Sequence, residues 1–331
     1  MQRFNALWRR TATWLLRPWV LVARLVEVLW QLGSLAVVLV IQGSSPKPDV
    51  QKRLAQKILA TLTGLGPCFI KVGQSLSTRP DLVRRDWLEQ LTQLQDNLPP
   101  FPHAIALATI ERELGAPADQ LFEQFPDYPV AAASLGQVYK TQLADGHWVA
   151  VKVQRPGLRE QITLDLYIVR NIAAWLNRNI GLIRSDLVAL IDELGKRVFE
   201  EMDYCNEAAN AERFAALHAH NPRIAVPRIY HHATSRRVLT MEWIEGVKLT
   251  NLEAVRGIGV DPDDMVTVGV NCSLQQLLEH GFFHADPHPG NVFYLPGNTI
   301  AFIDFGMVGR LSRRRKEDLL KLLLGLVERN P

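Results

Sequence analysis

The spacing of hydrophobic positions changes several times along the chain, and each change predicts a different kind of element. Residues 19–41 are mostly apolar and predict one long helix. Residues 50–118 carry apolar side chains at helical spacing, with breaks at 64–67 and 97–102, where glycine and proline gather. The first third of the sequence is therefore predicted to be largely helical.

A second pattern begins after residue 118, where short apolar runs bounded by turn residues predict strands. The turn Ala144-Asp145-Gly146 has the composition of a hairpin connection. The predicted strands are residues 122–125, 137–143, 148–154, 228–232, 238–242, 292–294 and 301–303, and the later predicted helices are 158–218, 261–281 and 314–328. This mixture of short strands and longer helices predicts an α+β fold.

Composition narrows the functional classes. The chain has 331 residues, of which 47% are hydrophobic, so it can build a sizeable core and is not expected to be disordered. The net charge of +3 does not indicate a nucleic-acid binder. Cys68, Cys205 and Cys272 form no CxxC pair, which disfavours a disulfide framework or a cysteine zinc site.

The apolar stretch 19–41 raises the question of a membrane. It is long enough to span a bilayer, but Arg24 and Glu27 interrupt it, and each charge would cost roughly 2.5–3.5 kcal/mol at the bilayer centre. Three interpretations remain: a helix buried against the protein, an interfacial helix and a true span. We favour peripheral membrane association, because four arginines precede the stretch. They are Arg3, Arg9, Arg10 and Arg17.

The first chemical motif is Val149-Ala150-Val151-Lys152, a lysine at the end of an apolar strand. On its own, such a lysine is best interpreted as an edge residue that reaches solvent, because burying an unpaired ammonium is costly. The same pattern in kinases places a lysine on the nucleotide phosphates and pairs it with a glutamate of a helix.

The second motif lies in residues 284–291, His-Ala-Asp-Pro-His-Pro-Gly-Asn. A metal pair formed by His284 and His288 would need a helix, which the two prolines break. A loop that carries Asp286, with Asn291 five residues later, matches the catalytic loop HRDxxxxN of kinases. In that pattern the aspartate orients or deprotonates the acceptor and the asparagine holds magnesium. Ala285 replaces the usual arginine, so control through an activation-loop phosphate is not expected.

The third motif is Asp304-Phe305-Gly306, which follows an apolar strand. Alone this tripeptide recurs by chance. Here it comes eighteen residues after Asp286, with a predicted hairpin between the two motifs. The order of lysine, Asp/Asn loop and Asp-Phe-Gly favours a nucleotide site in which Asp304 is the main magnesium ligand.

A fourth feature, Ala131-Ala132-Ala133-Ser134, stands where a kinase places its glycine-rich loop. Glycines allow a backbone to approach phosphates closely, whereas alanine restricts it. The segment is either a loop of small residues or an altered phosphate cover that binds nucleotide differently.

Together these motifs resemble the UbiB-like family of atypical kinases, the ADCK-type proteins associated with prenyl-quinone metabolism. The resemblance covers roughly residues 50–310. It rests on Lys71-Val72-Gly73-Gln74 as the family's KxGQ, on the alanine segment 131–134, on 149–152, on Glu201-Met202-Asp203 as its ExD, and on 284–291 and 304–306. Ordinary protein kinases lack both KxGQ and the alanine segment, which makes the combination specific.

The resemblance implies roles for matched positions. Lys152 would contact the phosphates and pair with Glu207, and Asp286 would be catalytic. Asn291 and Asp304 would hold Mg²⁺, and the backbone of Glu242 and Trp243 would bind the adenine of ATP or ADP. In addition, Lys71 and Gln74 would lie over the active site, with Lys71 near Glu201 and Asp203, where a protein kinase receives its peptide.

Helical spacing is consistent with two separate partners for the two glutamates. Glu201 and Glu207 are six residues apart, which at about 100° per residue places them about 120° apart around a helix. One can therefore face Lys152 while the other faces Lys71. Two solvated helix carboxylates would have been the default interpretation without the neighbouring motifs.

The implied fold is α+β and protein-kinase-like, with a small β-rich lobe, a helical lobe and an added helical KxGQ segment. We expect a basic, apolar N-terminal segment (1–45), a KxGQ extension (50–118), a kinase-like N-lobe with a helical insert (119–246) and a partial C-lobe (247–331). The C-lobe is expected to be truncated, because the sequence ends soon after Gly306, as a fragment or as a short member of the family.

The leading functional hypothesis is an ATP- and Mg²⁺-dependent atypical kinase or ATPase that supports ubiquinone- or plastoquinone-type or related isoprenoid-lipid metabolism. Its expected partners are membrane lipids, isoprenoid-quinone intermediates and biosynthetic enzymes, at the cytoplasmic face of a membrane. An aminoglycoside- or choline-kinase-type phosphotransferase is an alternative, since its loop HGDxHxxN resembles residues 284–291. A protein kinase and a nucleotide-gated scaffold without turnover are the others.

Overall fold

A computed structural model of the chain describes residues 18–43, 45, 47–77, 87, 99–179, 186–248, 251–287 and 290–327. The basic residues before position 18, together with His288 and Pro289, lie outside this part. The chain forms two compact units. The first comprises Met1–Ala106, Asp127–Tyr139 and Val153–Met202, and the second comprises Leu107–Pro126, Lys140–Lys152 and Asp203–Pro331.

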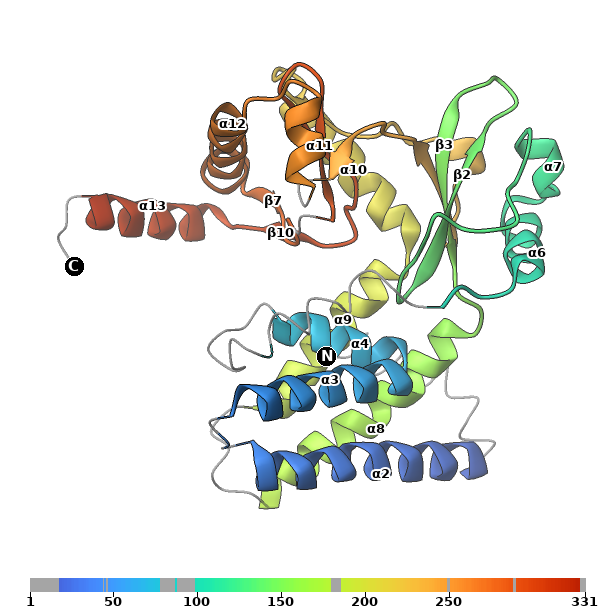
Figure 1. The fold of residues 1–331 in the computed structure, drawn as a ribbon, viewed down its shortest axis with the longest axis vertical. Helices are drawn as coiled ribbons and strands as arrows, with labels where there is room; N and C mark the ends of the chain where they lie inside the picture. Colours follow the sequence, from blue (N-terminus) through green and yellow to red (C-terminus); the bar gives the residue numbers. More distant parts are fainter. Residues whose placement is uncertain are drawn as a thin grey trace. The chain divides into compact units, whose positions relative to one another are not determined.

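The first unit is built mainly from helices. They are α2 (Pro18–Gln42), α3 (Pro48–Leu65), α4 (Pro67–Ser77), α8 (Leu158–Asn179) and α9 (Leu187–Glu201). Figure 1 shows α2 packed beside α3 and α8. Their shared core contains Val28 of α2, Leu65 of α3, Phe69 of α4 and Ile162 of α8, each at most 3% exposed. The apolar stripes read from the sequence thus meet in one core.

Helix α2 is mostly apolar, but only one of its faces is buried. Val28 and Leu35 are buried, whereas other large side chains remain exposed. Those that are more than 50% exposed are Trp19, Val22, Val26, Trp30, Val37, Val40 and Ile41. Part of the helix therefore belongs to the core of the unit, while another face has no partner in the described part of the chain.

A four-stranded sheet follows, with strand order β1 (Ala131–Ala132), β2 (Gly136–Gln142), β3 (Trp148–Gln154) and β5 (Val238–Glu242). Strands β2, β3 and β5 lie where the apolar runs predicted them. Gly146 adopts a φ of 82° in the turn between β2 and β3, a conformation that favours glycine.

Two predicted strands are wrong in most of their length. Residues 118–121 form the short helix α7 (Ala118–Leu121), and Phe122 makes only an isolated bridge to Leu143. The ring of Phe122 packs on that of Phe125, so burial of the aromatics explains the apolar run. Residues 228–232 make one bridge, Ile229 to Met241, before a 3₁₀ turn begins at His231.

The second unit contains α10 (Tyr204–His218) and a small sheet of order β4-β9-β8-β6. The bounds of these strands are β4 (Ile224–Ala225), β9 (Thr299–Phe302), β8 (Val292–Leu295) and β6 (Val247–Lys248). A separate ladder pairs β7 (Phe282–His284) with β10 (Val308–Arg310). The remaining elements are α11 (Leu252–Gly257), α12 (Pro262–Leu274), the π-helix η4 (Gln275–His280) and α13 (Arg313–Val327), while α6 (His103–Leu114) crosses the unit boundary.

Candidate nucleotide site

Strand β3 and helix α10 bring Lys152 and Glu207 together. The ammonium Nζ of Lys152 lies 3.0 Å from Oε1 and 2.9 Å from Oε2 of Glu207, whose side chain is only 3% exposed. The alternation of β3 points Lys152 to the same face as its neighbours two positions away. The ion pair predicted between these residues is thus present, and Lys152 is not an edge lysine.

The ammonium also faces Asp304, with 3.4 Å between Nζ and Oδ2. Burial by itself would lower the pKa of Lys152. The carboxylates of Asp304 and Glu207 outweigh that effect and hold the pKa well above its ordinary value. Lys152 is therefore a permanent cation between two anions in the second unit, in the geometry that kinases use to bind phosphates.

Asp304 is held in place by its own turn and by α10. Its Oδ1 accepts a hydrogen bond of 2.9 Å from the amide of Gly306. The side chain of Asn210, on α10, donates to the carbonyl of Phe305 over 3.1 Å. Phe305 is 1% exposed and packs on Phe214, also of α10. Helix α10 therefore positions both Glu207 and the Asp-Phe-Gly turn.

The catalytic-loop segment is anchored through His284. Its Nδ1 accepts the amide proton of Asp286 over 3.2 Å, and its Nε2 faces the carbonyl of Asp304. These two bonds require a neutral imidazole with the proton on Nε2. Burial lowers the pKa of His284 despite the opposing effect of Asp304, which agrees with that state. The imidazole thus links the loop of Asp286 to the backbone of Asp304.

Further bonds fix the two ends of this segment. The buried Gln276, in the π-helix η4, accepts the amide proton of His284 through Oε1 over 2.9 Å. Asn291 donates from Nδ2 to the carbonyl of Asp286 over 3.3 Å, and its own carbonyl accepts from Ile303. π-Helical turns recur at functional sites, and this one leads directly into β7 and the catalytic loop.

The donor set fits magnesium. Asn291 uses its amide nitrogen toward Asp286, which leaves its side-chain oxygen as a ligand, and Asp304 supplies a carboxylate. Among the residues that the structure describes, no group of three or more His, Cys, Asp or Glu side chains could hold a metal ion. Mg²⁺ needs no such cage, because it is commonly bound by one or two side chains together with substrate phosphates and water.

The KxGQ helix forms its own contact within the first unit. Lys71 of α4 makes an ion pair with Glu201 at the end of α9, and both side chains are largely buried. Gln74 lies on the same helix and is half-buried. Glu201 and Glu207 thus have different lysine partners. The predicted continuous helix through both residues is wrong, because α9 ends at Glu201 and α10 begins at Tyr204, so the break between the two helices separates the partners.

Asp203 has a structural role in the second unit. Its carboxylate accepts the amide proton of Cys205 and so caps α10, and it lies 3.5 Å from Nε of Arg236. Capping of this kind stabilises a helix by about 1 kcal/mol. The predicted proximity of Lys71 to Asp203 would join the two units and stays a prediction, as does the position of Lys71 and Gln74 over the active site.

The alanine segment is a tight hairpin. Ala131 and Ala132 form β1, opposite Val138 and Gln137, and the amide of Ala133 donates to the carbonyl of Gly136 over 2.8 Å. Ser134 is buried. Nε of Arg155 holds the carbonyl of Ala133 over 3.0 Å. This backbone is fixed by hydrogen bonds, and its role as a phosphate cover stays a prediction.

Residues 242–244, which follow β5, form the segment that we call the hinge. The amide of Glu242 donates to Arg228, and that of Trp243 donates to Trp148, over 2.8 and 2.9 Å. The amides of these two residues are therefore not available to an adenine. The next amide, that of Ile244, has no partner among the described hydrogen bonds. Sequence reasoning missed the amide of Ile244. The signal that could have found it is that successive amides at the end of β5 bond to alternate sides, Glu242 to Arg228 and Trp243 to Trp148.

Comparison with known proteins identifies the family. A family model described as "ABC1 atypical kinase-like domain" matches residues 93–331. A curated relative, "Protein ACTIVITY OF BC1 COMPLEX KINASE 3, chloroplastic" of Arabidopsis thaliana, is 46% identical over 95% of this chain and 44% of its own length. An uncharacterized protein of Synechocystis is 50% identical over 95% of this chain and 46% of its own length.

A solved structure supports the same assignment. The chain in the complex of Rv3197 with erythromycin from Mycobacterium tuberculosis is 32% identical, with a TM-score of 0.57 over 78% of this chain and 68% of that one. This likeness and the family match confirm the predicted α+β kinase-like fold. The present chain spans about half the length of the curated relatives it matches. It belongs to the ABC1 atypical kinase-like family, as its KxGQ, alanine and Asp-Phe-Gly motifs predicted.

Proposed function

We propose that the second unit binds ATP or ADP with Mg²⁺ and acts as an atypical kinase or ATPase. The observation that carries this proposal is the placement of the Lys152 ammonium against both Glu207 and Asp304. A lysine that is permanently charged, with a carboxylate at 3.4 Å that can hold a metal ion, suits a polyphosphate bound through Mg²⁺. The family assignment supports a kinase-type activity.

Each residue then has a defined task. Lys152 binds nucleotide phosphates, and Glu207 orients the lysine. Asp304 and the side-chain oxygen of Asn291 would hold Mg²⁺, which would neutralise charge on the phosphates. Asp286, held by His284 and Asn291, accepts the proton of the attacking hydroxyl or water. The carbonyl of Glu242 and the amide of Ile244 would bind the adenine edge.

A thermal-shift titration tests the nucleotide site directly. ATP and ADP are added with and without Mg²⁺ to the wild type and to Asp304→Asn. Because a ligand of the folded state raises stability by RT ln(1 + [L]/Kd), the wild type should show a Mg²⁺-dependent shift. The variant should lose that dependence. An equal Mg²⁺-dependent shift in both proteins, or no shift in either, contradicts the proposal.

Measurement of ATP turnover distinguishes an enzyme from a nucleotide-gated scaffold. Hydrolysis is measured with the wild type and Asp286→Asn in the presence of lipid vesicles. Release of phosphate that depends on Asp286 supports an ATPase, and transfer to an added alcohol supports a small-molecule phosphotransferase. Binding without release of phosphate or transfer would leave the scaffold as the function.

We propose further that the first unit associates peripherally with a membrane through α2. This helix is the one in the described part of the chain that is long and apolar enough to cross a bilayer, and only 11% of its most apolar stretch is buried. Trp19 and Trp30 are 66% and 77% exposed, as expected at a lipid interface. Arg24 is engaged with Asp165 of α8, a contact that a spanning helix would lose.

Flotation with liposomes that contain anionic lipid tests this association. Trp30→Asp should reduce the bound fraction severalfold, because it places a charge on the exposed apolar face of α2. The matched control is Tyr128→Asp, at a side chain of the same unit that is 82% exposed but outside α2. Equal binding of both variants and the wild type would exclude α2 as the anchor.

We infer from the family resemblance that the lipid served is an isoprenoid quinone or one of its precursors, and that biosynthetic enzymes are partners. The exposed apolar face of α2 is suited to a substrate that resides in a membrane. A quinone precursor with a polyprenyl tail should stimulate ATP turnover in vesicles, whereas the same ring without the tail should not. Equal stimulation by both compounds would argue against a lipid substrate.

A further inference from the structure

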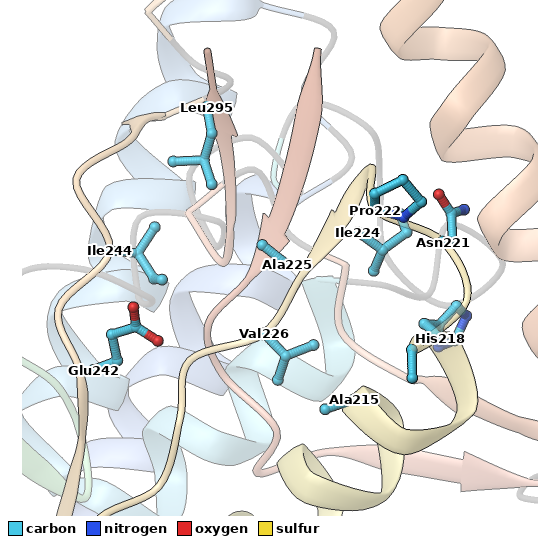
Figure 2. Close-up of a pocket in the computed structure, with 11 residues that line it drawn as sticks. Ala215, His218, Asn221, Pro222, Ile224, Ala225, Val226, Glu242, Ile244 and Leu295 are labelled. Atoms are coloured by element: carbon cyan, nitrogen blue, oxygen red, sulfur yellow. The ribbon is translucent and has the colours of Figure 1, made fainter. Parts of the chain in front are cut away.

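A pocket of about 420 Å³ lies in the second unit, between the C-terminal end of α10 and the hinge. Figure 2 shows Glu242 and Ile244 of the hinge on one side of it and Ala215 and His218 of α10 on the other. Lys152, Asn291 and Asp304 do not line it. It is therefore a different place from the proposed phosphate and Mg²⁺ site.

The walls are mainly apolar. Ala215, Val226, Ile244 and Leu295 line the pocket, and each is half-buried, so each still presents hydrocarbon that a ligand could cover. Ligand pockets typically measure 300–1,000 Å³ and combine apolar walls with a few polar groups. At about 420 Å³, this one suits a ligand with a single ring and a short chain.

Three side chains in the pocket are strongly polar: Glu242, His218 and Asn221, and the oxygen Oδ1 of Asn221 already accepts the amide proton of Arg223 over 3.0 Å. Glu242 and His218 present hydrogen-bond acceptors. Glu242 is exposed, and its Oε2 accepts the amide proton of Arg228 over 3.1 Å. No cationic side chain in the described part of the chain forms an ion pair with it. This distinguishes Glu242 from Glu245, which pairs with Lys140.

His218 is the second acceptor. It is 2% exposed, its Nδ1 is 3.0 Å from the carbonyl of Phe214, and its Nε2 has no partner in the described structure. Because Nδ1 donates to that carbonyl, Nε2 carries a lone pair. Burial lowers the pKa of His218, which keeps the ring neutral. A buried acceptor without a donor costs free energy, which a ligand with a donor would recover.

We propose that this pocket binds a small amphipathic amine, with the ammonium at Glu242 and the apolar body against Ala215, Val226 and Leu295. An uncompensated carboxylate attracts a cation and repels an anion, so a carboxylic acid or phosphate of similar size is disfavoured. A neutral alcohol keeps the apolar contact and can donate a hydrogen bond, but it gains no ion pair.

Occupation of the pocket would act on the proposed nucleotide site, and this part rests on the proposed function. One wall is α10, which carries Glu207 and holds Phe305 through Asn210. The other wall includes Ile244, whose amide we assign to adenine. A ligand that touches both elements is positioned to change nucleotide affinity, and the coupling must be reciprocal.

Calorimetric titration with three probes of one size tests the binding: 4-phenylbutylamine, 4-phenylbutanol and 4-phenylbutyrate. The amine should bind about five-fold tighter than the alcohol, the size expected of an ion pair at a partly exposed carboxylate, and the acid should bind weakest. Glu242→Gln keeps an acceptor for the amide of Arg228 and should abolish the preference for the amine. Glu245→Gln, the matched control, should leave that preference unchanged.

A second variant tests the place of binding. Ala215→Leu fills the pocket from α10 and should weaken all three probes alike, with folding checked by circular dichroism. If that variant fails to fold, Val226→Leu makes the same test from the segment that follows β4. Equal affinity for amine and acid, or a preference for the amine that survives Glu242→Gln, overturns the proposal.

The effect of the amine on nucleotide binding is measured in a separate experiment. The Kd for ADP with Mg²⁺ is determined with and without saturating 4-phenylbutylamine. A change that Glu242→Gln removes supports the coupling. Amine binding without any ADP binding would reject the proposed nucleotide function and keep the pocket, whereas ADP binding without amine binding would reject the pocket alone.

Discussion

Arg24 donates to both carboxylate oxygens of Asp165, with 2.7 Å from Nε to Oδ1 and 3.0 Å from Nη2 to Oδ2. The side chain of Asp165 on α8 is fully buried and that of Arg24 on α2 is 14% exposed. A bidentate pair of this kind fixes the position of one helix on another. The charge that interrupts the apolar stretch of α2 is therefore part of the core of the first unit.

Breaking this pair from one side should be costly. Arg24→Leu leaves the carboxylate of Asp165 buried and unpaired, and should lower the free energy of unfolding by about 3–5 kcal/mol. The double variant Arg24→Leu/Asp165→Leu removes both charges and should recover most of the loss. Urea unfolding of the four proteins measures the cycle. Additive effects of the two substitutions would show that the pair is not coupled.

Lys152 should contribute separately to stability and to binding. Lys152→Met removes the ammonium that pairs with the buried carboxylate of Glu207 and should cost about 3–5 kcal/mol, whereas Lys152→Met/Glu207→Leu should regain stability without regaining nucleotide affinity. Urea unfolding and ADP titration distinguish the two effects. Full nucleotide affinity in the double variant would remove Lys152 from the site.

The stabilising effect of Lys152 should also have a characteristic pH dependence. Because its pKa is raised in the folded state, the contribution is complete below the ordinary lysine pKa of about 10.4 and is lost only as pH rises through the raised value. The stability difference between wild type and Lys152→Met should therefore stay constant from pH 6 to about 9. A decline within that range would contradict the raised pKa.

His284 should give the opposite dependence. Burial lowers the pKa of His284, so as the pH falls the unfolded chain binds a proton at this residue before the folded chain does. Its contribution is complete above the ordinary histidine pKa of about 6.5 and is lost as pH falls through the lower folded value. His284→Gln should flatten the acid limb of stability by up to about 1.4 kcal/mol per pH unit. His232→Gln, at an exposed side chain, is the control for the loss of a histidine.

Two glycines should respond differently to alanine. A Cβ on Gly309 in β10 would lie 2.0 Å from Cζ of Phe283, its partner in β7, so Gly309→Ala must displace that ring at a cost of about 1–3 kcal/mol. Gly257, at the end of α11, has open space around its Cα. Gly257→Ala should be neutral or slightly stabilising. Thermal unfolding compares them, and equal effects would reject the steric account.

Local chemistry made much of the site predictable. Lys152, Asp286 and Asp304 each stand in a short motif whose spacing can be recognised without coordinates, and the apolar run 148–154 after the turn at 144–146 predicted β3. The pairing of Lys152 with Glu207 followed from the resemblance. Helical spacing could not have given it, because Glu201 and Glu207 lie on two separate helices, α9 and α10.

Contacts between residues distant in sequence were beyond such reasoning. Nothing near Arg24 indicates Asp165, 141 positions away. The pattern therefore favoured peripheral association and left a buried helix and a span as alternatives. Strands of two residues such as β1 and β6 are too short to show alternation. The aromatic run 122–125 failed as a strand because burial, rather than pairing, accounts for its apolar residues.

The alternation of the chain between the two units, after Ala106, Pro126, Tyr139, Lys152 and Met202, has a consequence for how this protein can be dissected. Neither unit corresponds to one continuous stretch of gene, so neither can be cloned, exchanged with a relative or released by a single proteolytic cut. The helical unit that contains Lys71 and the unit that contains Lys152 are expected to be inherited together, and chimaeras between relatives should succeed only where both are taken from the same parent.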